Sequence, residues 1–362
     1  MSEKAAVTEK KDGSEEAVGI AVKVVFIVIG VLLKLYGDDA WADNILLQAV
    51  FLVFGFVLLI KGADWFVDGA SKIADKLGIP QLIIGLTIVA FGTSAPEAAV
   101  SITAALSGGS IDIAIGNVMG SNIMNILLIL GISSIICPLA VQKSTRNLEI
   151  PFVIVITAFV LVMGYFDGSL GRVDGIIMLG LMVCFLVYLL NMAKKGQGSV
   201  DDVEGADEND KMWKLILWVL LGGAAIVLGS DVTVSSASYV AKSFGMTEKL
   251  IGLTIVAFGT SLPELITSTM AAAKKKADIA IGNIVGSNIF NILFVLAAAA
   301  TITPLPYRND ATNFLIDNIV ALVTALLLWI GVLNKDHKLK RGFGILMLVA
   351  YIGYFIYLLM AS

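Results

Sequence analysis

Two glutamates are the residues most suited to chemistry in this sequence, because each lies inside an apolar segment. Glu97 and Glu264 sit about two helical turns into such segments, where an ionised carboxylate is costly unless it faces water or a cation. Neither segment offers a lysine or arginine at that depth, which disfavours a structural ion pair. Two carboxylates suit Ca²⁺, which accepts roughly six to eight oxygen ligands, better than Mg²⁺, which gives up its water reluctantly.

Oxygen donors surround these glutamates at helical spacing. A threonine lies four residues before each glutamate, and the next apolar segment carries a serine and an asparagine four apart, so each pair shares one helix face. These donors are Thr93, Thr260, Ser121, Ser287, Asn125 and Asn291. No cysteine or histidine joins them, which disfavours zinc, copper and iron and favours Ca²⁺ or an alkali ion.

Each glutamate follows a proline that should break its helix. Pro96 and Pro263 lack a backbone N–H and clash with the carbonyl four residues earlier, so we expect unwound helix near Gly92 and Gly259. Inside a membrane, such a break is tolerated only where it is buried in protein or lines a cavity, and transporters place ion sites there. Glycines on the following segments should allow close helix packing. They are Gly116, Gly120, Gly282 and Gly286.

The composition identifies an integral membrane protein. Of its 362 residues 58% are hydrophobic and only 15% charged, compared with about one quarter charged in soluble domains. The net charge of −4 gives no reason to expect a nucleic-acid partner. The two cysteines lie in apolar segments, and no nucleotide-binding loop or serine with an adjacent base appears. We therefore expect neither an enzyme nor a cofactor.

The elements that position the site are apolar segments of membrane-spanning length. Ten such segments form two sets of five around the acidic stretch 196–210, and an eleventh precedes them at 18–36. The ten are 45–67, 82–106, 113–136, 150–166, 173–193, 212–241, 250–273, 279–301, 314–333 and 342–359. The first segment could be a signal peptide, but its long acidic leader favours a retained extra helix.

An internal repeat relates the two sets of five. The segment IGLTIVAFGTSAPE at 84–97 returns as IGLTIVAFGTSLPE at 251–264, and DIAIGNVMGSNIMN at 112–125 returns as DIAIGNIVGSNIFN at 278–291. An odd number of spans per repeat inserts the second half from the opposite side of the membrane, which gives an inverted pair. The predicted fold is all-α and polytopic. It comprises a tail and extra helix (1–44), the first repeat (45–195), an acidic loop (196–211) and the second repeat (212–362).

Loop charges support this topology. Lysines and arginines gather in alternate loops, which is typical of cytoplasmic loops. They include Lys72, Lys76, Lys143, Arg146, Lys194, Lys195, Lys274, Lys275, Lys276, Lys335 and Arg341. The acidic loop falls on the same side and is therefore predicted to be cytoplasmic.

The repeated motifs resemble those of the Ca²⁺/cation antiporter superfamily, specifically the sodium/calcium exchanger family and its microbial exchangers. The resemblance covers residues 45–362 and implies ten core helices in a prokaryotic plasma (inner) membrane. It implies that Glu97, Glu264 and the carbonyls of Thr93 and Thr260 bind Ca²⁺. It further implies Na⁺ sites at a set of small polar residues and alanine carbonyls: Ala90, Ser94, Ser121, Asn125, Ala257, Ser261, Ser287 and Asn291. The transported ions would be Ca²⁺ and Na⁺, with the bilayer as partner and no obligate protein partner.

The sequence leaves alternatives to Na⁺/Ca²⁺ exchange open. Exchange of Ca²⁺ for protons, or with co-transport of K⁺, is open, although hydrophobic residues occupy 118–119 and 284–285, where the proton/calcium branch typically carries a further acid. A passive cation channel could also line its pore with carboxylates, but the inverted repeat speaks against it. Asp64, Asp68 and Asp231 lie near helix ends, and we expect structural roles for them.

Overall fold

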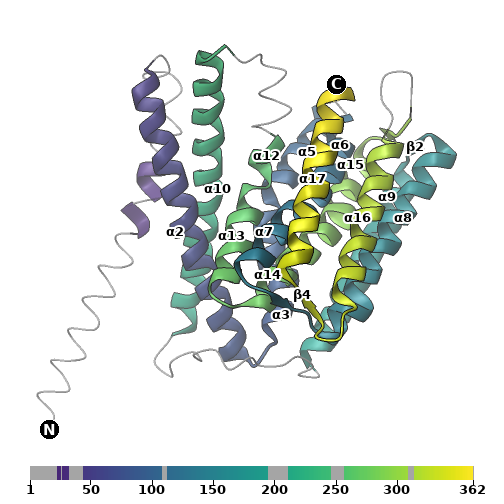
Figure 1. Ribbon diagram of the computed structural model, residues 1–362, viewed down its shortest axis with the longest axis horizontal. Helices are drawn as coiled ribbons and strands as arrows, with labels where there is room; N and C mark the ends of the chain where they lie inside the picture. The colour runs from purple at the N-terminus through teal and green to yellow at the C-terminus, as the bar shows by residue number, and fades with distance from the viewer. Residues whose placement is uncertain are drawn as a thin grey trace, which may run out of the picture. The chain divides into compact units, whose positions relative to one another are not determined.

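The structure is a computed structural model that describes residues 23–25, 27–31, 44–107, 112–194, 211–245, 257–308 and 314–361. Elements of the first half are α2 (Ile45–Leu77), α3 (Gln81–Ile84), η1 (Gly85–Val89), α4 (Ala90–Thr93), α5 (Ala95–Ser107), α6 (Asp112–Met124), η2 (Asn125–Leu130), α7 (Gly131–Ile136), β1 (Leu139–Ala140), η3 (Thr145–Glu149), α8 (Ile150–Asp167), β2 (Ser169–Leu170) and α9 (Arg172–Lys194). Elements of the second half are α10 (Met212–Ser243), α12 (Ala257–Thr260), α13 (Leu262–Ala273), α14 (Ala277–Phe290), η5 (Asn291–Leu296), α15 (Ala297–Ile302), β3 (Leu305–Pro306), α16 (Leu315–Val332), β4 (Lys338–Leu339) and α17 (Arg341–Ala361). The η elements are π-helical. Figure 1 shows how the helices and strands follow one another along the chain.

The helices are long and apolar enough to cross a membrane, as the sequence predicted. Within the described ranges, 8 helices pass this test, and a helix pair from Gln81 to Leu106, bent by 50°, adds a ninth span. The span predicted at 250–273 is described only from Ala257 onward, and the extra first helix is described only at 23–25 and 27–31. The polytopic helical fold is therefore confirmed, whereas the total of ten core helices stays a prediction.

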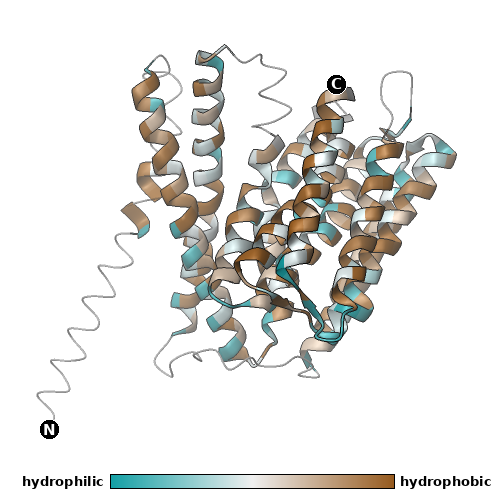
Figure 2. Ribbon diagram, in the orientation of Figure 1, coloured by the Kyte–Doolittle hydropathy of each residue, from teal (hydrophilic) through white to brown (hydrophobic). Residues whose placement is uncertain are grey.

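The segments that carry the second repeated motif form the interior. In an apolar 18-residue stretch of Ala277–Ile302, 94% is buried, whereas in the equivalent stretch of Arg341–Met360 only 11% is buried. The outer helices α8 and α17 instead expose large apolar side chains, such as Val155 and Ile345, an arrangement that is unfavourable in water and suits contact with lipid. Both helices carry long hydrophobic stretches in Figure 2. The helix Ala277–Ile302 is thus enclosed by other helices of its own unit.

Two short strand pairs connect the halves in equivalent ways. β1 pairs with β4 and β2 pairs with β3, both antiparallel. β1 and β3 follow corresponding helices, α7 and α15, while β2 and β4 follow α8 and α16. The loop after α7 therefore pairs with the loop after α16, and the loop after α8 pairs with the loop after α15. These two-residue strands are an addition to the predicted all-helical fold.

The chain divides into two compact units. One comprises Met1–Phe66 with Leu217–Gly259, and the other Val67–Ile216 with Thr260–Ser362. In the first unit, α2 and α10 approach each other through glycines seven residues apart. A Cβ on Gly62 would lie 3.0 Å from the carbonyl oxygen of Gly222, and one on Gly55 would lie 3.1 Å from that of Gly229. The two helix backbones are therefore in direct contact.

Candidate ion-binding site

The site forms where two helices are interrupted, at Ser94 and Ser261, and both of these residues belong to the second unit. Ser94 separates α4 from α5 with φ −86° and ψ 8°, and Ser261 precedes α13 with φ −92° and ψ 6°. Gly92 and Gly259 instead lie inside α4 and α12, so the breaks occur two residues later than the sequence predicted. The reason is that Pro96 and Pro263 are each the second residue of a new helix, α5 or α13, and in the first turn of a helix a backbone N–H has no intrahelical partner, so its absence costs nothing.

Each glutamate is the third residue of the helix that follows the break. Glu97 in α5 and Glu264 in α13 are both fully buried. A carboxylate in the first turn of a helix is stabilised by the positive end of the helix dipole. No ion pair within the described parts of the chain involves either glutamate. Their charges are therefore left for a ligand to balance.

The two interrupted helices hold each other's glutamates through the serines at the breaks. The Ser94 hydroxyl donates to Glu264 Oε1 at 2.8 Å, and the Ser261 hydroxyl donates to Glu97 Oε1 at 3.2 Å. Equivalent residues of the two halves thus make equivalent contacts across the repeat. Each carboxylate therefore accepts a hydrogen bond from the half to which it does not belong.

Serines of the following helices complete this arrangement. Ser121 Oγ donates to Glu97 Oε1 at 3.3 Å, and Ser287 Oγ donates to Glu264 Oε1 at 3.5 Å. Ser121 Oγ also lies 3.1 Å from Ser261 Oγ. The structure therefore brings both glutamates and all four predicted serines into one cluster.

Four buried oxygens of this region lack a hydrogen-bond partner among the described residues. They are Oε2 of Glu97, Oε2 of Glu264, Oδ1 of Asn125 and Oδ1 of Asn291. A buried acceptor without a partner costs about 1–3 kcal/mol, and more when it is charged. The four come in equivalent pairs and are all hard oxygen ligands, so a Ca²⁺ or alkali ion would satisfy them.

Both of these asparagines begin a π-helical stretch. Asn125 opens η2 and Asn291 opens η5, and π-bulges of this kind are frequent at functional sites. Their amide nitrogens are engaged across the repeat: Asn125 Nδ2 donates to Asn288 Oδ1 at 2.9 Å, and Asn291 Nδ2 donates to Asn122 Oδ1 at 3.1 Å. The amides are thereby held with Oδ1 as the remaining acceptor.

Sequence reasoning missed four buried or partly buried asparagines of this network: Asn117, Asn122, Asn283 and Asn288. Asn283 is typical, because its Oδ1 accepts a hydrogen bond from Thr93 Oγ1 at 3.0 Å while its Nδ2 donates to Ser268 Oγ at 2.8 Å. The signal was available, since all four lie in the repeated segments 112–125 and 278–291.

The remaining predicted ligands are Thr93 and Thr260, which would bind through their carbonyls, and Ala90 and Ala257. Thr260 Oγ1 donates to Asn117 Oδ1 at 3.5 Å, the counterpart of the contact made by Thr93. The Ala90 carbonyl accepts the backbone N–H of Ser94 at 3.0 Å, so it is already engaged in α4. Ala257 begins α12 in the first unit, and its side chain lies outside the described residues.

Asp68, for which the sequence predicted a structural role, takes part in ion pairs. Its carboxylate forms ion pairs with Lys274 at 2.7 Å and Lys276 at 3.0 Å, which join α2 to the link between α13 and α14. Asp68 lies inside α2 and not near the helix end where the sequence predicted it, because the helix continues to Leu77. The acidic loop at 196–210 lies outside the described residues.

Comparisons with known proteins give one consistent result. The model of the family described as sodium/calcium exchanger protein matches residues 47–191 and 214–360, which are the two halves. The chain is 42% identical to the putative antiporter CaxA of Alkalimonas amylolytica, over 82% of this chain and 93% of that protein. It is 35% identical to the inner membrane protein YrbG of Escherichia coli (strain K12), over 79% and 89%. It also matches a solved structure of the sodium-calcium exchanger NCX_Mj soaked with Na⁺ and Sr²⁺, with a TM-score of 0.74, 32% identity and coverage of 88% of this chain and 99% of that one.

Proposed function

Because the chain belongs to the sodium/calcium exchanger family of membrane antiporters, we propose that it exchanges Ca²⁺ for Na⁺ across the membrane. The observation that carries this proposal is the pair of buried glutamates, each with one oxygen bound by serines and the other without a partner among the described residues. Ca²⁺ would bind Glu97, Glu264 and the carbonyls of Thr93 and Thr260.

Na⁺ is the coupling ion that best fits the residues around this pair. The flanking Na⁺ sites would use neutral oxygens, those of Ala90, Ala257, Ser94, Ser261, Ser121, Ser287, Asn125 and Asn291. The segments around 118–119 and 284–285 hold Val118, Met119, Ile284 and Val285 instead of further acids, which disfavours proton exchange. The solved relative NCX_Mj is described as a sodium-calcium exchanger, which supports the same assignment.

The charge of the pair explains why movement of one ion requires movement of the other. Two carboxylates buried without counterions carry a large desolvation penalty, whereas the same carboxylates loaded with one Ca²⁺ or several Na⁺ do not. The protein with an occupied site can therefore switch the side of the membrane to which the site opens, whereas the same change with an empty site is unfavourable. Alternating access with this restriction gives exchange without ATP.

The fold proposed for this activity is ten core helices in two inverted repeats, 45–195 and 212–362, in the plasma (inner) membrane of a prokaryote. The acidic loop 196–211 would lie in the cytoplasm, and residues 1–44 would add a tail and an extra helix. Support comes from the contacts across the repeat, which occur in equivalent pairs at the serines, the asparagines and the short strands.

A binding measurement tests the site. Purified protein titrated with Ca²⁺ in Na⁺-free buffer should bind it, and Glu97→Gln or Glu264→Gln should weaken binding at least about hundredfold, since removing one partner of a buried charged site costs about 3 kcal/mol or more. Added Na⁺ should compete, whereas choline at the same ionic strength should not.

The matched control is Asp174→Asn. Asp174 is also buried, but its carboxylate accepts the backbone N–H of Gly171 at 2.7 Å, near the start of α9. This variant should bind Ca²⁺ as the wild type does. Unchanged Ca²⁺ binding in either glutamine variant would show that the site lies elsewhere.

A further inference from the structure

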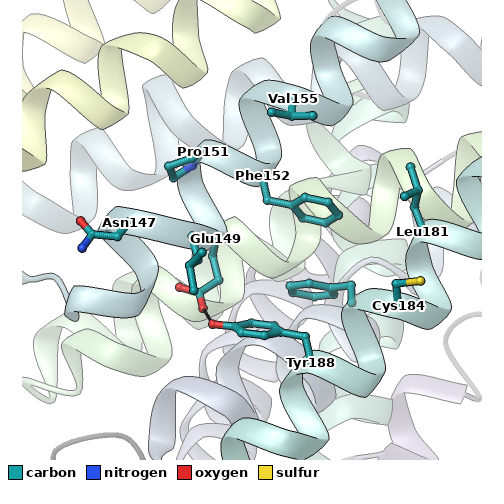
Figure 3. A pocket seen from close by; sticks show the side chains of 10 residues that line it. Asn147, Glu149, Pro151, Phe152, Val155, Leu181, Cys184 and Tyr188 are labelled. Carbon is teal, nitrogen blue, oxygen red and sulfur yellow. Dashed lines mark hydrogen bonds between the residues drawn. The ribbon is translucent and has the colours of Figure 1, made fainter.

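A crevice separate from the ion site lies between the η3–α8 segment and α9, within the second unit (Figure 3). Its volume is about 380 Å³, and its lining is mostly apolar, with Phe152, Val155 and Leu181 among the contributing side chains. Such a volume is within the range of small-molecule sites. The polar groups of the lining are gathered around one buried carboxylate, that of Glu149.

Glu149 has an acceptor available for a ligand. Only 1% of this residue is exposed, and its Oε1 accepts a hydrogen bond from the Tyr188 hydroxyl at 2.5 Å. Its Oε2 makes no hydrogen bond of normal geometry with the described residues, and the Thr145 hydroxyl, one turn earlier, is the other polar group beside the carboxylate. A buried carboxylate oxygen without a donor is costly. The nearest arginine in sequence, Arg146, is directed to Asn147 Oδ1 and to His337. A ligand with a positively charged N–H donor would satisfy Glu149.

Aromatic rings next to Glu149 favour the same kind of ligand. Phe152 stacks on Phe185 with centroids 5.6 Å apart, and Phe185 lies 6.1 Å from the ring of Tyr188, so three rings follow one another along the crevice (Figure 3). Ring faces attract ammonium groups by cation–π interaction, more strongly where water is excluded. A carboxylate beside aromatic rings is therefore suited to an ammonium group.

The crevice has the polarity profile of a lipid at the membrane surface. Glu149 is the fifth residue of the span Thr145–Asp167, and Tyr188 lies six residues before the end of Arg172–Lys194. Both polar groups are thus near one end of their helices, at headgroup depth. Val155 and Leu181 lie about 10 Å deeper, at about 1.5 Å per residue, and Val155 is 62% exposed on the outer face. The deep end of the crevice is therefore at the level of acyl chains.

We propose that this crevice binds a phospholipid whose headgroup ends in a primary ammonium, with the ammonium on Glu149 and one acyl chain along Phe152, Val155 and Leu181. Charge complementarity selects this occupant, because the headgroup brings the N–H donors and positive charge that Glu149 Oε2 lacks, and a diacyl lipid brings the apolar body that the crevice accommodates. The site is independent of the ion-binding cluster.

Native mass spectrometry of the full chain tests the proposal. The protein is equilibrated in mixed micelles with equal amounts of phosphatidylethanolamine and phosphatidylcholine of the same acyl chains, and the lipids retained after desolvation are counted. The wild type should retain phosphatidylethanolamine about tenfold more than phosphatidylcholine, a preference that one charge-assisted hydrogen bond can supply. Glu149→Gln should remove the preference, and Asp174→Asn, which removes a buried carboxylate elsewhere on α9, should keep it.

A second variant separates lipid binding from a folding defect. Leu181→Trp fills the apolar end and leaves Glu149 intact, so it should lower retention of both lipids while Ca²⁺ binding at the ion site remains. A preference that survives in Glu149→Gln, or is lost equally in Asp174→Asn, would overturn the proposal. So would a wild type that retains added dodecylamine but no phosphatidylethanolamine, because the crevice would then bind a free amine and not a phospholipid.

Discussion

Replacement of Gly286 by alanine should be among the most damaging small changes in this protein. Gly286 lies in α14 where that helix crosses η1 and α4, and an added Cβ would lie 2.8 Å from Leu86 Cα and 2.8 Å from Ala90 Cβ. Carbon atoms in favourable contact are about 3.5–4.0 Å apart. The overlap involves backbone, so no side-chain rotation relieves it. We expect a cost of about 3 kcal/mol, the upper end of the range for overpacking.

The consequence should extend to the ion site, because the next residue of α14 is Ser287, which donates to Glu264 at 3.5 Å. We therefore expect Gly286→Ala to lower the melting temperature in detergent by on the order of 5–10 °C and to weaken Ca²⁺ binding measured by titration. The control is Gly180→Ala on α9, whose Cβ would meet no described atom within 4 Å and which should leave the melting temperature unchanged or slightly higher. A Gly286→Ala protein that melts and binds Ca²⁺ like the wild type would refute the close crossing of α14 and η1.

Three further substitutions test separate contacts by thermal unfolding. Asn283→Ala removes two buried hydrogen bonds, one of them to Thr93, and should cost about 2 kcal/mol; stability within error of the wild type would contradict the network. Asp68→Asn removes two partly exposed ion pairs and should lower the free energy of unfolding by about 1 kcal/mol. This loss should be smaller in high choline chloride, because salt screens exposed ion pairs. A loss that does not depend on salt would show that it does not come from these ion pairs. Lys23→Ala removes an ammonium that lies 3.6 Å from the ring centroid of Trp218, and should cost about 1 kcal/mol and change the tryptophan emission; unchanged emission would argue against this contact.

Much of the fold follows from the sequence, because its signals are long and repeated. Each span is a run of apolar residues of bilayer length, and the two halves repeat nearly the same motifs around Glu97 and Glu264. The family follows from the same motifs. The helix interruption before each glutamate was also predictable from Pro96 and Pro263, although not its position at Ser94 and Ser261. That position depends on where the new helix can restart, which the proline alone does not determine.

Other features were not predictable, because they depend on contacts between distant residues. A repeat shows that Ser94 and Ser261 are equivalent, but not that each donates to the glutamate of the other half. The strand pairs contain two residues each, too few for an alternating pattern. Glu149 and Tyr188 are 39 residues apart and meet only because side chains of the η3–α8 segment and of α9 touch across the crevice.

The central claim is exchange of Ca²⁺ for Na⁺, and transport by the full chain in sealed vesicles tests it most directly. Uptake of ⁴⁵Ca²⁺ is followed against outward gradients of Na⁺, K⁺ or protons, each imposed alone at matched membrane potential. We expect uptake to be driven by the Na⁺ gradient and to be lost in Glu97→Ala and Glu264→Ala proteins that still insert. Uptake driven only by protons, or flux that needs no gradient of another ion, would contradict it.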